Sequence, residues 1–332
     1  MNEPPVIEAD NLVVEYGRGA KAVRALQGIS FRVEPGECVG FIGANGAGKT
    51  STIKTLMGFI FPSSGSVRMF GRPAGRAQSR RRIGYLPEVA QYYPFMKARE
   101  LLELYGGLSG LSRTQLRRRI PPLLEKVGLA GKGEVLLKNF SKGMQQRLGI
   151  AQALIAEPDA LIFDELSSGL DPLGRHDLRQ VLLELKRAGR TIFFSSHELT
   201  EVEALCDRVL IIHKGRIVTE AAVDELLKPL NQFEILVRRD ERAALPAELD
   251  GCEVCDEGEM RRFIISDLET YTRALDALRR TGADVVKTES RTRSLEQYFI
   301  ELVRRSAGHT QAESSQDPTG GSNREGGGGA SC

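Results

Sequence analysis

A glycine-rich run over residues 43–50 has the composition of a phosphate-binding loop. It reads Gly-Ala-Asn-Gly-Ala-Gly-Lys-Thr and fits the pattern G-x-x-x-x-G-K-[ST] at every fixed position. The apolar run 38–42 before it predicts a strand, and residues 49–57 after it predict a helix, which is the setting that the pattern requires. Glycines let backbone amides approach a phosphate closely, and the helix N-terminus adds positive potential. A glycine-rich turn without a ligand is the alternative, and the complete match argues against it.

Each position of this loop then has an expected role. Lys49 can neutralise the β- and γ-phosphates of a nucleotide, and the Thr50 hydroxyl can bind Mg²⁺. The residues expected to hold the phosphates are Gly43, Ala44, Asn45, Gly46, Ala47, Gly48, Lys49, Thr50 and Ser51.

Two adjacent carboxylates follow a second apolar run. Residues 160–163 predict a buried strand, and Asp164 and Glu165 stand at its carboxyl end, where open parallel sheets bind ligands. Asp164 can hold Mg²⁺, directly or through water. Glu165, which the pleat directs differently, can orient or deprotonate an attacking water. By themselves the two acids indicate a solvated turn, but beside a complete phosphate loop they favour phosphate-ester hydrolysis.

A serine and a histidine extend this set. Ser141 can cap the helix that follows it, and the exposed amides of that helix form another anion site, so the two roles are compatible. His197 follows the apolar run 192–194 and precedes a helix, from where its imidazole can donate a hydrogen bond to a γ-phosphate. A lone histidine there would more often be a cap or a core residue.

The segment around Ser141 resembles a family signature. Residues 140–147 read Phe-Ser-Lys-Gly-Met-Gln-Gln-Arg, similar to the Leu-Ser-Gly-Gly-Gln signature of ABC ATPases, and the resemblance covers about residues 7–220. It implies ATP and Mg²⁺ as ligands and a head-to-tail homodimer, because the signature of one protomer faces the ATP of the other. It assigns Tyr16 as the aromatic residue on adenine, Glu88 to the metal at the Q-loop, Ser141 and Gly143 to the signature, Ser168 to Asp171 as the D-loop and His197 as the switch.

Three of these assignments carry an alternative or a departure. Tyr16 is otherwise a half-buried tyrosine of an edge strand. Glu88 stands where the family usually has glutamine, and a carboxylate accepts from a metal-bound water but cannot donate as an amide does. Leu166 and Ser167 replace a common Pro-Thr or Pro-Ser, which changes backbone stiffness rather than the reacting groups, so we expect activity to survive.

The order of periodic segments predicts the fold. Strands alternating with helices imply a parallel sheet. An antiparallel sheet is expected before it at residues 7–33, and helices at 97–105 and 115–127 interrupt it. With the resemblance, the fold class is α/β: a P-loop NTPase core with an antiparallel β subdomain and a helical subdomain, plus a small C-terminal α+β domain. The expected bounds are 1–228 for the ATPase domain (helical subdomain about 87–150), 229–305 for the accessory domain and 306–332 for a disordered tail.

Composition limits the function classes. The chain has 332 residues, 41% of them hydrophobic and 27% charged, and a formal net charge of +2, so no strong field for nucleic acid or anionic lipid is implied. The arginine runs 80–82 and 117–119 are expected to be solvated or salt-bridged rather than bound to nucleic acid. Five scattered cysteines do not form a disulfide framework, and the pair Cys252 and Cys255 is expected to be accidental rather than a metal site.

The expected partner lies in a membrane. Residues 1–10 do not resemble a signal peptide, and no apolar run reaches the ~20 residues of a membrane helix. We therefore expect a cytoplasmic subunit, peripheral on the cytoplasmic face of the membrane, that powers transport through separate transmembrane permease subunits. Residues 84–88 and 294–299 resemble bacterial multidrug and antibiotic export ATPases. The alternatives are an importer subunit, a soluble ABC ATPase without a transport role, and a P-loop kinase, which has no use for a signature helix.

Overall fold

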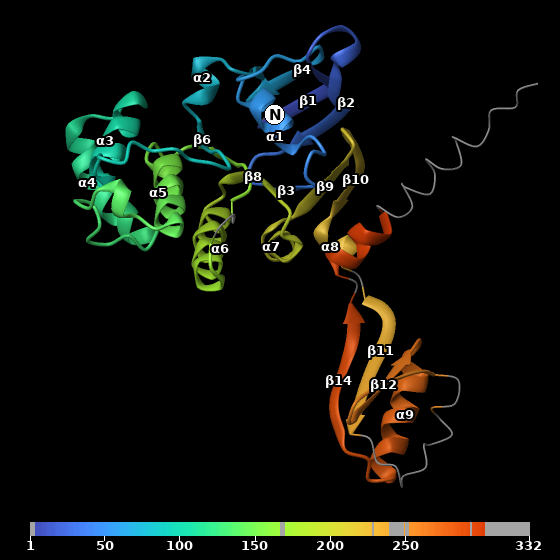
Figure 1. Ribbon diagram of the computed structural model, residues 1–332. Helices are drawn as coiled ribbons and strands as arrows, with labels where there is room; N and C mark the ends of the chain where they lie inside the picture. Colours follow the sequence, from blue (N-terminus) through green and yellow to red (C-terminus); the bar gives the residue numbers. More distant parts are fainter. Residues whose placement is uncertain are drawn as a thin grey trace, which may run out of the picture.

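The computed structural model describes residues 4–166, 170–227, 229–238, 249, 252–292 and 294–302. The first unit contains a six-stranded sheet, a four-stranded antiparallel sheet and the helices around them (Figure 1). The second unit is a four-stranded antiparallel sheet with one helix. The predicted α/β fold, with an added α+β unit, is confirmed. The predicted loop residues Ser168 and Gly169 and the predicted tail 306–332 lie outside the described residues.

A six-stranded sheet in the order β10-β9-β3-β8-β7-β6 forms the centre of the first unit. Its strands from β9 to β6 are parallel, and β10 is antiparallel to β9. All residues of β3, β7 and β8 are buried, as expected for a sheet covered on both faces. The strands are β3 (Cys38–Ile42), β6 (Ile83–Leu86), β7 (Ala160–Phe163), β8 (Thr191–Ser196), β9 (Arg208–His213) and β10 (Arg216–Ala222).

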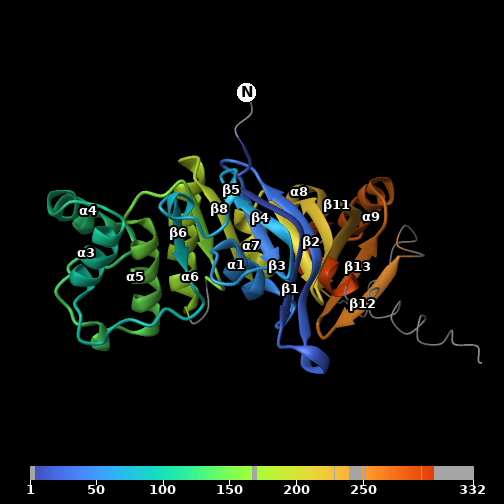
Figure 2. The ribbon, with the colours of Figure 1, turned by 90° about the horizontal axis from the view of Figure 1, so that it is seen from above.

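Two layers cover this sheet. On one face lie the antiparallel sheet β2-β1-β4-β5 and helix α1, and on the other lie α6 and α7 (Figure 1). Figure 2 views the molecule from above, with the antiparallel sheet in front. Side chains of strand β8 alternate between the two faces of the sheet. The ring of Phe193 is 5.8 Å from that of Phe31 in the antiparallel layer, whereas Ile192 and Phe194 pack in the core on the helical side. The elements are β1 (Ile7–Tyr16), β2 (Val23–Val33), β4 (Ser64–Met69), β5 (Arg72–Pro73), α1 (Lys49–Leu56), α2 (Ala77–Arg80), α6 (Pro172–Arg187), α7 (Leu199–Leu205), α8 (Val223–Leu226) and the 3-10 helix η1 (Gly19–Lys21).

Three helices form a subdomain at one end of the first unit. They are α3 (Ala98–Leu108), α4 (Arg113–Lys126) and α5 (Lys142–Leu154), with the 3-10 helix η2 (Leu137–Asn139) before α5. The first two were predicted, with ends that differ by one to three residues. Helix α4 contains Pro121 and Pro122, which have no N–H and so leave the carbonyls of Arg117 and Arg118 without their helical donors.

The second unit has the strand order β12-β13-β11-β14, with α9 packed on one face through Ile235, Phe263 and Leu278. Its elements are β11 (Pro229–Arg238), β12 (Glu253–Glu257), β13 (Met260–Ile265), α9 (Leu268–Arg280) and β14 (Val285–Thr292). The sequence pattern predicts strands at 233–237, 263–265 and 284–288 and helices at 268–279 and 295–303, so it predicts every element of this unit except β12. Every residue of β12 is exposed, so no alternating apolar face marks it as a strand. Cys255 of β12 is exposed, whereas Cys252 packs against the core of this unit.

After β14 the chain returns to the first unit. Pro229 pairs with Thr292, so the second unit begins and ends at the same place. Residues 295–302 are helical and lie beside α8 (Figure 1). Leu295 is fully buried in the core of the first unit, its amide donates to the carboxylate of Glu203 in α7, and Tyr298 packs nearby. The sequence prediction assigned this helix to the accessory domain, whereas its contacts are with the first unit.

Candidate active site

The loop between β3 and α1 adopts a conformation that its glycines permit. Gly46 and Gly48 have φ angles of +77° and +118°, in the region that favours glycine. A Cβ on Gly43 would lie 2.4 Å from the carbonyl oxygen of Ile212. Gly48 is the N-cap of α1, whose first amides receive no side-chain cap. The loop therefore leaves unpaired helix donors beside the Lys49 side chain, which is the arrangement that binds phosphate.

A carboxylate lies between the two groups predicted to bind the γ-phosphate. The Nζ of Lys49 donates to the carbonyl of Gly43 at 2.7 Å and is 3.2 Å from one carboxylate oxygen of Glu165. The Nδ1 of His197 contacts the other oxygen of Glu165. Lys49 and Glu165 are both buried. The three residues come from the loop, the end of β7 and the end of β8, so the parallel strands bring their carboxyl ends together as predicted.

Ser195 connects the two acids of the site. Its hydroxyl donates to Asp164 Oδ1 at 2.7 Å and accepts from the amide of Glu165 at 3.0 Å. Glu165 has φ +51°, a conformation that costs a residue with a side chain of order 1 kcal/mol and that the surroundings must hold. Ser195 was not predicted, although a polar residue at the end of an apolar strand, two residues before His197, is a usable signal.

The oxygen donors fit a magnesium ion. Thr50 Oγ1 is 3.4 Å from Asp164 Oδ1, and Thr50 and Glu88 line one pocket, which is described below. Mg²⁺ prefers oxygen ligands and is usually bound by one or two carboxylates together with substrate phosphates. Burial, together with the charge of Asp164, raises the pKa of the neighbouring Tyr85 to about 12, so this phenol stays neutral.

A pocket of about 370 Å³ collects most of the predicted residues. It is lined by Ala25, Asn45, Gly46, Gly48, Lys49, Thr50, Ser51, Glu88, Glu165 and His197. Ala44 and Ala47 shape the loop through a backbone hydrogen bond of 3.1 Å. Tyr16, 43% exposed, donates from its hydroxyl to Ser51 at 3.1 Å.

Eight of the predicted residues do not line this pocket, and three of them, Ser141, Gly143 and Asp171, stand at the starts of α5 and α6. Ser141 caps α5 by accepting from the amide of Met144 at 3.2 Å, and Asp171 caps α6 by accepting from the amide of Gly174 at 2.9 Å. A Cβ on Gly143 would lie 3.4 Å from Leu170, so the starts of α5 and α6 are neighbours. The first turn of α5 is thus a second group of helix amides, separate from the phosphate loop.

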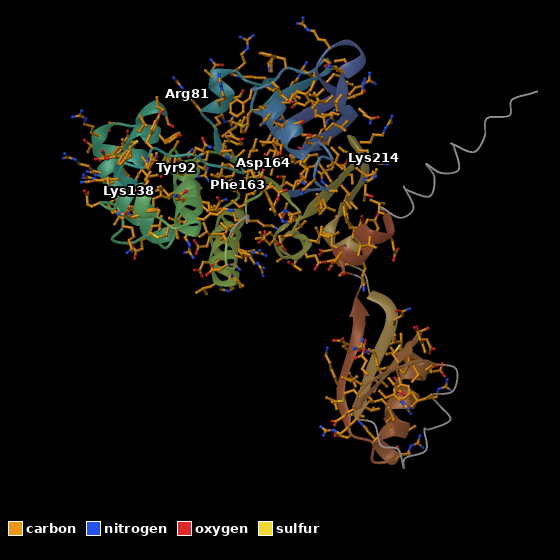
Figure 3. All side chains as sticks on the ribbon, viewed as in Figure 1. Arg81, Tyr92, Lys138, Phe163, Asp164 and Lys214 are labelled. Atoms are coloured by element: carbon orange, nitrogen blue, oxygen red, sulfur yellow. The ribbon has the colours of Figure 1, made fainter. Side chains whose placement is uncertain are left out.

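Two further side chains join the site to α5. The Tyr92 hydroxyl donates to Gln152 at 3.1 Å, which ties the segment after Glu88 to α5. Burial raises the pKa of this phenol above its ordinary value. Gln146, buried in α5, donates to the carbonyl of Leu166 at 2.7 Å. Figure 3 labels Tyr92 near α5, and Phe163 and Asp164 at the end of β7.

One arginine of each run forms an ion pair with an acid. Arg82 pairs with Asp159 at 2.5 Å and Arg119 with Glu157 at 3.2 Å. Glu103, an acid that lies between the two runs in the sequence, is instead 3.9 Å from Arg99. The acids come from the loop after α5, which tertiary folding brings close.

Comparisons with known proteins agree with this geometry. Residues 26–168 match the family model described as ABC transporter. An uncharacterized ABC transporter ATP-binding protein of Nostoc is 38% identical over 92% of this chain and 91% of its own length. The bacitracin transport ATP-binding protein of Bacillus licheniformis is 35% identical over 90% of this chain and 97% of its own length.

A solved structure has the same fold. It is the dimeric structure of an ATP-binding cassette in a post-hydrolysis state bound to ADP and Pi, and it matches 65% of this chain and 98% of its own with a TM-score of 0.61 and 22% identity. Together with the phosphate loop and the two acids beside it, the relatives place this chain in a family: it belongs to the ATP-binding proteins of ABC transporters.

Proposed function

We propose that this chain hydrolyses ATP as one half of a head-to-tail homodimer and so powers export through a separate membrane permease. The observation that carries the proposal is the position of Glu165, whose carboxylate lies between Lys49 and His197 at the phosphate loop. A negative group already occupies the place between the two donors that a γ-phosphate would take. ATP binding therefore exchanges one anion for another.

The exchange frees the catalytic base. Once Lys49 and His197 bind the γ-phosphate, the Glu165 carboxylate loses both partners and can accept a proton from water. The water oxygen attacks the γ-phosphorus, the bond to the β–γ bridging oxygen breaks, and ADP leaves with the bonding electrons. Asp164 and Thr50, with Glu88 at the pocket wall, would hold Mg²⁺, which neutralises charge on the phosphates. Tyr16, at the rim, stacks on adenine.

Glu165→Gln tests this assignment. The amide cannot take the proton, so we expect ATP binding to be retained and turnover to fall by at least about a hundredfold, the lower end of the range for a general base. The matched control is Glu134→Gln, an exposed acid of the helical subdomain, which should leave turnover unchanged. Turnover of Glu165→Gln near that of the unaltered chain would show that another group is the base.

The dimer is supported by the amides that this pocket does not use. Ser141 and Gly143 stand at the start of α5 and do not line the phosphate pocket. We propose that these amides of α5 bind the ATP held by the partner subunit when the dimer closes. The dimeric structure bound to ADP and Pi, which has the same fold, supports this arrangement. We expect Glu165→Gln with ATP to elute as a dimer, and Ser141→Arg in that background to remain monomeric.

The permease interface is supported by exposed apolar side chains next to the pocket. Val89, Tyr93 and Phe95 are 67–76% exposed and follow Glu88 directly, and Tyr92 ties this segment to α5. An apolar surface of this kind marks a contact with another protein. It also links that contact to the nucleotide through Glu88. Within the described residues, no helix is long and apolar enough to cross a bilayer.

The export direction and the membrane location rest on the relatives. The Nod factor export ATP-binding protein I of Burkholderia lata is 35% identical over 91% of this chain and 98% of its own length, and the Bacillus licheniformis protein is named for bacitracin transport. We infer a peripheral position on the cytoplasmic side of the membrane. Purification of the chain from detergent-solubilised membranes, with mass spectrometry of what accompanies it, tests this: a permease should co-purify, and Tyr93→Asp with Phe95→Asp should abolish its recovery. Equal recovery with the double variant would refute the proposed interface.

A further inference from the structure

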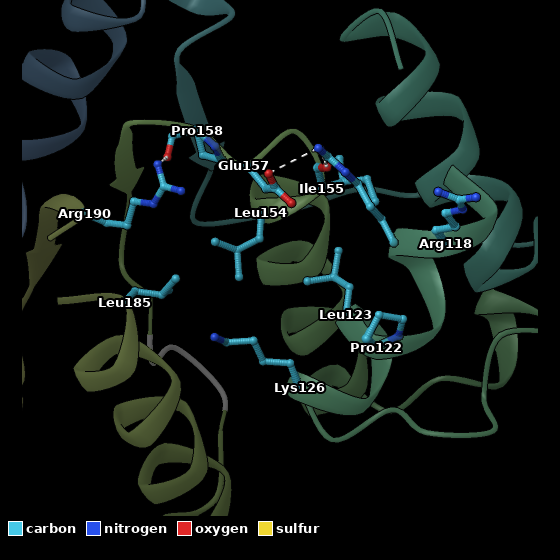
Figure 4. Close-up of a pocket in the computed structure, with 11 residues that line it drawn as sticks. Arg118, Pro122, Leu123, Lys126, Leu154, Ile155, Glu157, Pro158, Leu185 and Arg190 are labelled. Carbon is cyan, nitrogen blue, oxygen red and sulfur yellow. Dashed lines mark hydrogen bonds and ion pairs between the residues drawn. The ribbon is translucent and has the colours of Figure 1, made fainter. Parts of the chain in front are cut away.

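A second pocket lies between the helical subdomain and the end of α6. We call it the junction pocket and define it by Arg118, Leu123, Lys126, Leu154, Leu185 and Arg190. Its volume is about 360 Å³, within the range of small-molecule sites. Figure 4 shows its lining side chains from α4, the end of α5 and the end of α6. None of these residues lines the phosphate pocket.

The floor of the junction pocket is apolar, and its rim carries four cations, Arg118, Arg119, Lys126 and Arg190, and one acid, Glu157, which pairs with Arg119. Leu123, Leu154 and Leu185 point into it, and Lys126 reaches across from α4 toward α6 (Figure 4). Arg190 contributes a guanidinium from the core side. Pro122, on the same wall, belongs to the proline pair in α4 that leaves the Arg118 carbonyl without its helical donor.

The cations of the rim retain capacity for an anion. Lys126 is 3.1 Å from Glu184, and the two side chains are 36% and 60% exposed, so solvent screens this ion pair and another anion can replace Glu184. Arg190 uses one nitrogen for the carbonyl of Pro158 at 3.0 Å and for Asp159 at 3.7 Å, which leaves other N–H donors of the guanidinium available. Arg118 has no ion-pair partner in the part of the chain that the structure describes.

We infer that the junction pocket binds a small amphipathic anion, a single acyl chain with one carboxylate head. The chain lies on the leucine floor, and the head pairs with Lys126 and Arg190. Charge complementarity selects this chemistry, because an uncharged amphiphile offers the cations no carboxylate and a cationic one is repelled. Since Lys126 belongs to α4 and Arg190 to the strand side of the core, one head bound to both holds the helical subdomain against α6. The occupant is thus a regulatory ligand of the ATPase.

The test uses the full chain and decanoate below its micelle concentration, followed by isothermal titration calorimetry. Saturable one-to-one binding is expected, weaker by about tenfold for decanol and for Lys126→Glu. The matched control is Lys132→Glu, an exposed cation of the same subdomain outside the pocket, which should bind decanoate as the unaltered chain does. Leu123→Ala, which shortens the floor while keeping every charge, should also weaken binding.

Hydrogen exchange separates binding from bridging. Bound decanoate should slow exchange both in α4 and in residues 185–190, and ATP turnover should change by at least about twofold, with Lys126→Glu abolishing both effects. Absence of saturable binding, or equal binding by Lys126→Glu and Lys132→Glu, would overturn the site. Protection of only one of the two segments would overturn the bridge.

Discussion

The single hydroxyl group of Ser195 forms hydrogen bonds with two neighbouring residues. The hydroxyl donates a hydrogen bond to the Asp164 carboxylate and accepts one from the backbone amide of Glu165, a residue with positive φ. The hydroxyl therefore orients a proposed metal ligand and the backbone of the proposed base together. Residues that orient catalytic groups in this way typically contribute 10- to 100-fold to activity.

Ser195→Ala should lower kcat about 10- to 100-fold while ATP binding changes little, because the phosphate loop keeps its own contacts. The comparison is Ser79→Ala, another buried serine, whose hydroxyl donates to the carbonyl of Met69 outside the site. Steady-state ATPase rates and nucleotide titration distinguish the two. A Ser195→Ala enzyme as fast as Ser79→Ala would remove Ser195 from the site's machinery.

Asp171 has two proposed roles that one pair of variants separates. As the N-cap of α6 its carboxylate accepts from Gly174, so Asp171→Ala should cost about 1 kcal/mol of unfolding free energy, and Asp171→Asn, which still caps, should cost much less. Turnover of the Asn variant then reports on the D-loop role that the resemblance implies, separately from capping. If Asp171→Asn is stable and fully active, capping explains this residue without any contact to a partner.

The sequence predicts the roles of residues in local motifs but not of residues whose partners are distant in the sequence. Lys49, Asp164 and Glu165 stand in local patterns whose chemistry does not depend on the rest of the chain. Tyr92 and Ser195 act on residues 60 and 31 positions away, so no local pattern reveals them. The contact of Glu165 with Lys49 and His197 was also unpredictable, because motifs assign those groups to ATP rather than to one another.

Among the elements, buried strands were the easiest to predict and exposed ones the hardest. β7 is a continuous apolar run and β8 contains one at residues 192–194, as expected for strands of a sheet that is covered on both faces. β12 has five exposed residues and is held by pairing with β13, a cause that lies outside its own sequence. The helix at 295–302 was predicted, but its partner was not, since an amphipathic pattern does not say which core it joins.

Leu295→Ala should destabilise the first unit by about 2–5 kcal/mol, because the side chain is fully buried in the core beside α7. Leu268→Ala, at an exposed position of α9, is the control and should change stability by no more than about 0.5 kcal/mol. Urea unfolding followed by circular dichroism measures both. Similar midpoints for the two variants would show that residues 295–302 do not stabilise the first unit.

At the level of the whole molecule, the second unit is an insertion within the first. Because Pro229 and Thr292 are paired, a short linker can replace residues 229–293 and join the chain across about 5 Å. We expect this variant to keep the ATPase rate and the melting temperature of the first unit. A chain that ends at Leu227 should melt several degrees lower, because it exposes the surface that Leu295 covers. Equal melting of the two variants would contradict the insertion.

Two neighbouring attachments also limit how the second unit can move. A domain attached through one strand can rotate about three axes. A domain attached through two paired strands can bend mainly about the line that joins the two attachment points. One of the two attachments continues into the helix that Glu203 of α7 holds, and α7 begins directly after the His197 loop. We therefore expect the second unit to bend about a single axis, at a point attached to the helix that follows His197, the residue proposed to bind the γ-phosphate.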